Sequence, residues 1–349
     1  MKLWDLVSGA PAVAMLGMCK NAGKTTAFNS LIREQAARGS GTLGMTSIGR
    51  DGEGRDLVTG TDKPPIWLYE GMLAATAEQL LPLCDVSREI LASTGLYTSL
   101  GEVILFRAKS DGFVQLAGPA IVEQLTMLRK QFQAFGADCV LIDGALSRRS
   151  PLAGVTDGVC VLSTGASLDR DVDKVVAETA FVAELLGLKE KTLPAAGETA
   201  SENGPAGEEK SGAVGPGALP GSKVVLFRED GSRESAERLS DIKYGTGEET
   251  ILVRGALTEA QAAALVKDGR KKARLTLAVR DGSCLMMRRE TYARLRGQGL
   301  SFAVRKGSRL AAVTVNPFSA GGWSFDADEF LAKMQAAVNV PVLNVKTQK

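Results

Sequence analysis

Apolar positions along the first half of the chain recur with two different periods. Short apolar runs, which predict buried strands, occupy residues 13–16, 43–48, 103–107, 114–117, 139–142 and 159–162. Segments with the three-to-four-residue apolar spacing of amphipathic helices lie between and after them, at residues 25–38, 74–83, 87–93, 119–135 and 169–186. This alternation predicts an α/β fold with a mainly parallel sheet that is covered on both faces. Ligands of such folds bind at the carboxyl ends of the strands.

A composition change divides the chain. Residues 191–222 are rich in Gly, Ala, Pro, Ser and Glu and contain few large apolar side chains, so they predict a flexible linker or disordered insertion. A second α/β pattern follows, with strands expected at 224–227, 251–253, 275–279, 302–304, 311–315 and 342–345 and helices at 259–267, 289–297 and 327–338. We therefore expect a first domain over residues 1–190 and a smaller α/β domain over residues 223–349. The smaller domain carries no phosphate-binding motif, so by elimination we expect it to dock a partner.

The turn after the first predicted strand has the residues of a phosphate-binding P-loop. Gly23-Lys24-Thr25-Thr26 stands between an apolar strand and a helical pattern, which is the context that this motif requires. The first N–H groups of a helix have no intrahelical partner, and the helix dipole favours an anion there. Lys24 is expected to neutralise the β- and γ-phosphates of a nucleotide, Thr25 to hold Mg²⁺ and Thr26 to contact an inner phosphate. The rest of the expected nucleotide-binding loop consists of Gly17, Lys20, Asn21 and Ala22.

This loop departs from the consensus G-x-x-x-x-G-K-[ST]. Met18 stands where the first glycine is expected, and Gly17 lies one residue earlier. Either the loop is one residue longer, or Met18 replaces that glycine.

Two further segments fit a nucleotide site. Residues 140–143 form an apolar run that ends in Asp143, which is the form of a Walker B strand whose carboxylate orients Mg²⁺. Residues 46–53 follow the second predicted strand, and Asp51 or Glu53 could bind Mg²⁺ or order the attacking water in a loop that switches with the γ-phosphate. A plain surface turn has equal weight there, because Asp-Gly is a strong turn signal. Lys24, Asp51 and Asp143 are thus the expected catalytic residues, and the expected magnesium ligands are Thr25, Asp51 and Asp143.

The amino-acid composition excludes several classes of catalytic site and partner. The 349-residue chain has no histidine, which excludes Ser–His and Cys–His nucleophile mechanisms and histidine metal sites. The net charge of +2 indicates neither a nucleic-acid nor a membrane partner, and no apolar run approaches the ~20 residues of a membrane span. The first residues lack the features of a signal peptide, so we expect a cytoplasmic protein. Five scattered cysteines argue against a disulfide framework, and Cys19, close to a helix N-terminus and Lys20, is in a setting that can lower a thiol pKa.

The motifs together resemble a known family. Residues 1–9, the loop 17–26, the segment 46–53 and residues 141–145 are similar to the ATP-binding subunit of lysine 5,6-aminomutase reactivases, and residues 313–317 also resemble it. The resemblance implies a Mg²⁺- and ATP-dependent factor that exchanges inactivated cobalamin in an adenosylcobalamin-dependent aminomutase. Its implied partners are a second reactivase subunit and the aminomutase itself.

The P-loop also resembles that of dethiobiotin synthetase and other SIMIBI-type NTPases. Many of these work as dimers, so a homodimer is a further implied assembly. Some place a second lysine early in the loop that reaches across the dimer, but Lys20 lies one residue late for this role.

Three functional classes remain open from the sequence. The first is a chaperone-like ATPase, and the second is a ligase or small-molecule kinase of the dethiobiotin-synthetase type. The second needs basic groups near the γ-phosphate, for which the candidates are Arg50, Arg107, Lys109 and Arg148. The third is a regulatory nucleotide-binding protein without turnover, against which the intact Lys24, Thr25 and Asp143 argue. ATP is favoured over GTP because the chain lacks an Asn-Lys-x-Asp guanine motif.

Overall fold

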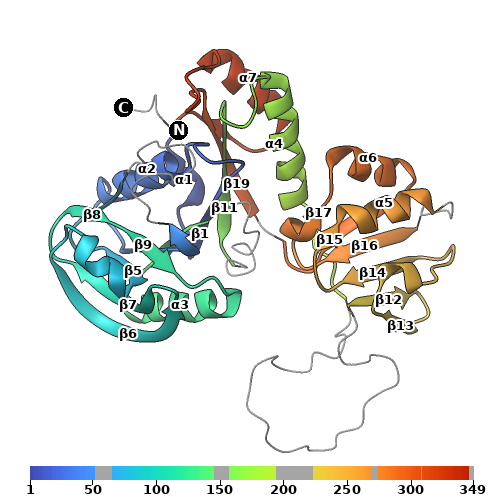
Figure 1. Ribbon diagram of the computed structural model, residues 1–349, viewed down its shortest axis with the longest axis horizontal. Coiled ribbons are helices and arrows are strands. Elements are labelled where there is room, and N and C mark those ends of the chain that lie inside the picture. Colours follow the sequence, from blue (N-terminus) through green and yellow to red (C-terminus); the bar gives the residue numbers. More distant parts are fainter. Residues whose placement is uncertain (52–64, 145–156, 194–222, 269–273, 308, 346–349) are drawn as a thin grey trace, which may run out of the picture. The chain divides into compact units, whose positions relative to one another are not determined.

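The computed structural model describes residues 1–51, 65–144, 157–193, 223–268, 274–307 and 309–345 (Figure 1). The chain forms two compact units. Residues 1–187 and 308–349 make up the first unit, and residues 188–307 make up the second. Both units are α/β, as the sequence predicts.

A nine-stranded sheet forms the centre of the first unit, in the order β20-β19-β11-β1-β10-β2-β5-β7-β6. Its strands are β1 (Ala12–Gly17), β2 (Leu43–Ser47), β5 (Leu73–Ala77), β6 (Arg88–Thr98), β7 (Gly101–Ala108), β10 (Cys139–Asp143), β11 (Val159–Gly165), β19 (Arg309–Asn316) and β20 (Val342–Leu343). The strands from β20 to β5 run parallel, and β7 and β6 continue the sheet antiparallel.

Helices cover both faces of this sheet. Val13 and Met15 of β1 share one core with the helices α1 (Leu3–Val7) and α2 (Lys24–Ala36). The alternate residues of β1 share the opposite core with α3 (Val122–Ala134), α4 (Val172–Leu186) and α7 (Ala327–Ala337). Because β1 is central and buried along its whole length, the loop that follows it leaves the sheet between two helical layers.

Smaller elements lie beside β2 and β5. β3 (Gly49–Asp51) pairs with β9 (Leu116–Gly118), and β4 (Ile66–Leu68) pairs with β8 (Gly112–Val114). The 3₁₀-helix η1 (Glu78–Leu83) connects β5 to β6.

The helices predicted at residues 74–83 and 87–93 are wrong. The first segment contains β5 and η1, and the second begins the long strand β6. Alanine favours helices, but the Ala-rich β5 is buried between β2 and β7, and pairing with these distant strands overrides local propensity.

The second unit contains a five-stranded sheet in the order β13-β12-β14-β16-β18. Its elements are β12 (Val224–Arg228), β13 (Arg233–Ala236), η3 (Leu239–Asp241), β14 (Glu249–Val253), β15 (Leu257–Thr258), α5 (Glu259–Lys267), β16 (Leu275–Val279), η4 (Gly282–Cys284), β17 (Leu285–Met286), α6 (Arg289–Gly297) and β18 (Ser301–Val304). β14, β16 and β18 are parallel, and β12 is antiparallel to both β13 and β14.

The predicted boundary at residue 223 also differs from the observed division. The segment from β19 to β20 joins the first sheet, where β19 pairs with β11 over its whole length, so residues 223–349 do not form one domain. The second unit is instead inserted between α4 and β19. Of the predicted linker, residues 194–222 lie outside the described residues. In the part of the chain that is described, no helix has the length and apolar character needed to cross a membrane.

Candidate functional site

Two residues of the loop between β1 and α2 have a left-handed backbone conformation. Asn21 and Gly23 have positive φ values of 61° and 91°, a conformation that glycine and asparagine tolerate best. The first hydrogen bond of α2 runs from the Ala27 N–H to the Gly23 carbonyl at 3.0 Å. The N–H groups of Lys24, Thr25 and Thr26 therefore precede the helical hydrogen-bond ladder at the positive end of the helix.

The predicted lysine and the predicted acid lie together. β1 pairs with β10 so that Met15 is level with Asp143, and Lys24 at the start of α2 reaches the end of β10. The Lys24 ammonium lies 2.8 Å from Asp143 Oδ1 and donates a 2.5 Å hydrogen bond to the Gly144 carbonyl. The Lys24 and Asp143 side chains are 16% and 5% exposed, so the charged pair is largely removed from water.

Gly17, rather than Met18, lies beside this lysine. A Cβ at Gly17 would lie 3.5 Å from the Cys19 carbonyl oxygen and 3.7 Å from the Lys24 side chain. The Met18 N–H extends the sheet by donating to the Ser163 carbonyl at 2.8 Å, and its side chain packs on a core cluster. This geometry favours the alternative of a loop that is one residue longer than the consensus.

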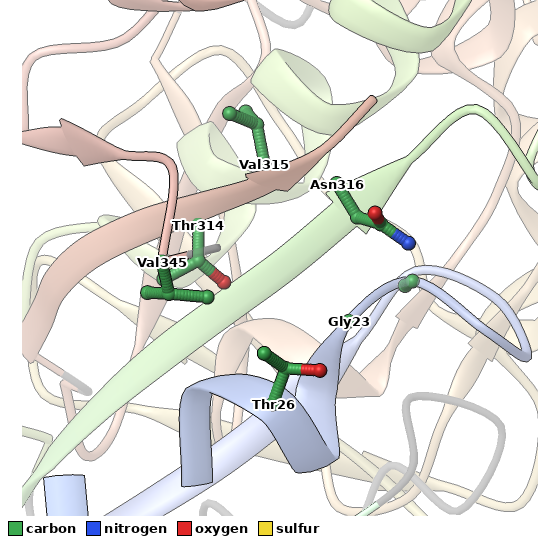
Figure 2. A pocket seen from close by; sticks show the side chains of 7 residues that line it. Gly23, Thr26, Thr314, Val315, Asn316 and Val345 are labelled. Atoms are coloured by element: carbon green, nitrogen blue, oxygen red, sulfur yellow. The ribbon is translucent and has the colours of Figure 1, made fainter. Parts of the chain in front are cut away.

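Asn316, the last residue of β19, braces the loop from the other side. Its Nδ2 donates to the Asn21 carbonyl at 3.0 Å, and a Cβ at Gly23 would lie 3.1 Å from the Asn316 Cβ (Figure 2). Sequence reasoning missed this contact, because it placed Asn316 in the second domain. The one signal was an apolar strand followed by Asn-Pro, which does not say where that strand pairs.

A small hollow separates the loop from β19. It is lined by Ala22, Gly23, Thr26, Thr314, Val315, Asn316 and Val345 (Figure 2). The hollow has no internal space for a water-sized sphere, so it is too small to contain a nucleotide. A nucleotide would instead lie along the loop and the first turn of α2.

The residues present fit a magnesium–phosphate group. Among the described residues no group of three or more Asp, Glu, Cys or His side chains is arranged to hold a metal ion. Mg²⁺ needs no such cluster, because it keeps several waters and combines one or two protein ligands with substrate phosphates. The Thr25 hydroxyl and the Asp143 carboxylate are the groups of this chain that would hold it.

Other predicted site residues are not brought to the loop. Arg107 donates to the carbonyls of Gly71 and Phe135, and Lys109 pairs with Glu89 at 2.8 Å. Arg107 belongs to β7, which three strands separate from β1. These two candidates therefore do not supply the basic groups that a kinase or ligase site needs.

The remaining predicted site residues are not fully described. The backbone of Asp51 ends β3 and pairs with Leu116, whereas the side chains of Arg50 and Asp51 lie outside the described residues. Glu53 and Arg148 lie outside them entirely. Lys20 is described, and its side chain is exposed.

The expectation of a lowered Cys19 pKa is wrong. Burial raises the pKa of this thiol to about 11, so it is protonated at neutral pH. The cause of this shift is desolvation, which disfavours the thiolate that an activated nucleophile needs.

No family model matches this chain, and neither a curated protein nor a solved structure matches it.

Proposed function

We propose that this protein binds Mg²⁺-ATP at the loop 17–26 and hydrolyses it. The observation that carries the proposal is the position of Lys24, whose ammonium is held by Asp143 and the Gly144 carbonyl at the N-terminus of α2. In this proposal, phosphate oxygens would replace the carboxylate and carbonyl oxygens around the ammonium. A cation held by exchangeable oxygen ligands, beside N–H groups that precede the helical hydrogen-bond ladder, is suited to a polyphosphate.

Each group has a distinct role in this proposal. The N–H groups of residues 24–26 bind phosphate oxygens, and Lys24 compensates the charge of the β- and γ-phosphates. Asp143 and Thr25 orient Mg²⁺, which supplies charge neutralisation for phosphoryl transfer. Asn316 holds the loop in the conformation that directs its N–H groups toward the ligand.

Hydrolysis is further proposed to reactivate an adenosylcobalamin-dependent lysine 5,6-aminomutase together with a second reactivase subunit. This step is supported by the sequence resemblance of residues 1–9, 17–26, 46–53 and 141–145. The ligase or kinase alternative has less support, because Arg107 and Lys109 are engaged elsewhere.

The test is ATP hydrolysis by the purified protein with Mg²⁺, alone and with the second subunit and a cobalamin-inactivated aminomutase. We expect slow basal turnover, stimulation by the partners and recovery of aminomutase activity. Lys24→Ala should reduce turnover by about 10²–10³-fold, the usual cost of losing one transition-state charge contact. Lys130→Ala, which removes an exposed lysine of α3, is the matched control and should leave turnover unchanged.

Two results would contradict the proposal at different levels. Equal activity of Lys24→Ala and wild type would exclude the loop as the nucleotide site. Hydrolysis that requires Lys24 but does not respond to the aminomutase would support ATP hydrolysis at the loop and exclude the reactivase role. The ligase or kinase function would then be favoured.

A further inference from the structure

The second unit carries an uneven charge that the net charge of the chain hides. Residues 250–307 contain thirteen lysines and arginines but four aspartates and glutamates, whereas the whole chain has a net charge of +2. The rest of the chain is therefore acidic overall. The excess of positive charge therefore lies in this part of the second unit.

Three of these cations, together with Lys223, form a row across four adjacent strands. Continuing the parallel registers of β14, β16 and β18 by one or two residues places Arg254, Arg280 and Arg305 level with one another. The antiparallel register of β12 and β14 places Lys223 level with Arg254. Backbone hydrogen bonds maintain this alignment beyond the strands, from the Arg254 N–H to the Lys223 carbonyl at 2.9 Å and from the Arg305 N–H to the Val279 carbonyl at 2.8 Å. We call Lys223, Arg254, Arg280 and Arg305 the cationic row.

Side-chain alternation directs the row to one face of the sheet. It is the face of Leu252 and Ala278, opposite the face on which Phe302 stacks with Tyr292 of α6. Lys223, Arg254 and Arg280 are exposed, and Arg305 is partly exposed.

Positive charges that lie level with one another on adjacent strands repel and lower the stability of the sheet. Neighbouring strands are about 4.8 Å apart, so the row spans about 14 Å with one positive charge at each strand. Arg280 is paired with the buried carboxylate of Asp281 at 3.0 Å, which relieves one position. An external anion that extends along the row would lower the repulsion among these cations further.

We propose that the cationic row binds an acidic polypeptide segment of a partner protein. A small phosphate compound would reach two neighbouring cations, whereas an extended polyanion reaches all four. Single-stranded nucleic acids bind through exposed aromatic side chains as well as cations. All four aromatic residues of the second unit, Phe227, Tyr244, Tyr292 and Phe302, are buried, which favours a protein over a nucleic acid. The proposal does not depend on nucleotide hydrolysis at the first unit.

The test uses the full chain and a fluorescent deca-glutamate peptide, with binding followed by fluorescence anisotropy at low salt. The row variant is Lys223→Gln/Arg254→Gln. The matched control is Arg294→Gln/Arg296→Gln, which removes two exposed arginines from α6 of the same unit. Thermal unfolding of both variants checks that the second unit remains folded.

We expect the row variant to bind the peptide about five- to thirtyfold more weakly than wild type, because each exposed ionic contact is worth about 0.5–1 kcal/mol. The control should bind within about twofold, and added salt should weaken the wild-type complex.

Three outcomes would overturn the proposal. Equal losses in both variants would mean that only the net charge attracts the peptide. Competition by tripolyphosphate at the same molar concentration would indicate a small-anion site. Tighter, row-dependent binding of a single-stranded oligonucleotide would indicate a nucleic-acid surface.

Discussion

Asn316 gives the sharpest test of how the loop is held, because one hydrogen bond joins it to the loop backbone. Asn316→Ala removes the 3.0 Å bond from Nδ2 to the Asn21 carbonyl. Such a bond contributes about 0.5–1.5 kcal/mol net. It also holds the carbonyl of Asn21, whose φ of 61° lies in the left-handed region.

Removing this hydrogen bond should mainly weaken the binding of the nucleotide. A loop that must be ordered on binding loses about 1 kcal/mol of binding free energy, so the Kd for Mg²⁺-ATP should rise about fivefold. Asn316→Asp keeps the shape of the side chain but sets a carboxylate against the Asn21 carbonyl. It also adds a negative charge beside the expected phosphates, so its Kd should rise further, by about thirtyfold at low salt.

The assay is isothermal titration calorimetry with Mg²⁺-ATP, with thermal unfolding measured in parallel. Gln298→Ala is the matched control, because Gln298 Nε2 makes a similar 3.0 Å bond to the Val266 carbonyl in the second unit. It should lower stability slightly and leave the Kd unchanged. If both Asn316 variants bind ATP within twofold of wild type, or if alanine weakens binding more than aspartate, the bracing role is refuted.

Three further predictions test the site and the packing. Asp143→Asn removes the carboxylate beside Lys24 and should lower Mg²⁺-dependent turnover by about 10²–10³-fold in a steady-state assay, and an unchanged rate would exclude its role. Burial raises the pKa of Cys19 from 9.0 to about 11, so the stability that the neutral thiol contributes is complete below pH 9 and declines toward pH 11. Urea midpoints across this range should fall less in Cys19→Ala, and identical slopes would contradict the assignment. Gly44→Ala would place a Cβ 2.6 Å from Phe132 Cδ1 and should cost about 1–3 kcal/mol. In thermal melts, combining it with Phe132→Leu should cost less than the sum of the two single changes.

The sequence predicts those parts of the site that local signals encode. An apolar strand, a turn with Gly23 and a helix starting at Lys24 are contiguous, and the structure forms them as expected. Asp143 ends an apolar strand, and parallel pairing of this strand with β1 brings the acid to Lys24. Each inference needed a single segment of chain and a general rule for parallel sheets.

The sequence does not encode pairing between distant segments in a readable form. β19 reads as a buried strand wherever it is placed, and its partner β11 lies about 150 residues earlier, at the register Val159↔Arg309. For this reason the sequence predicts a second domain that is too long and does not indicate the contact of Asn316 with the loop. The same limit explains β5 and β6, whose alanines and polar residues resemble helices until β7 lies between them.

The observed division leads to a prediction about the inserted unit. Glu190 and Val304 are paired as parallel neighbours, and the Lys191 N–H donates to the Val304 carbonyl at 2.8 Å. The chain therefore enters and leaves the second unit along adjacent strands that point the same way and lie about 4.8 Å apart. A linker of about three residues can join Lys189 to Arg305 without reversing the chain.

Replacing residues 190–304 by Gly-Ser-Gly should leave a first unit that melts cooperatively and binds Mg²⁺-ATP within about threefold of the full chain, because β19 can still pair with β11. The shortened protein should no longer bind the deca-glutamate peptide. Failure of the shortened chain to fold would show that the first sheet requires the insertion, and retained peptide binding would place the acidic-partner surface outside the cationic row.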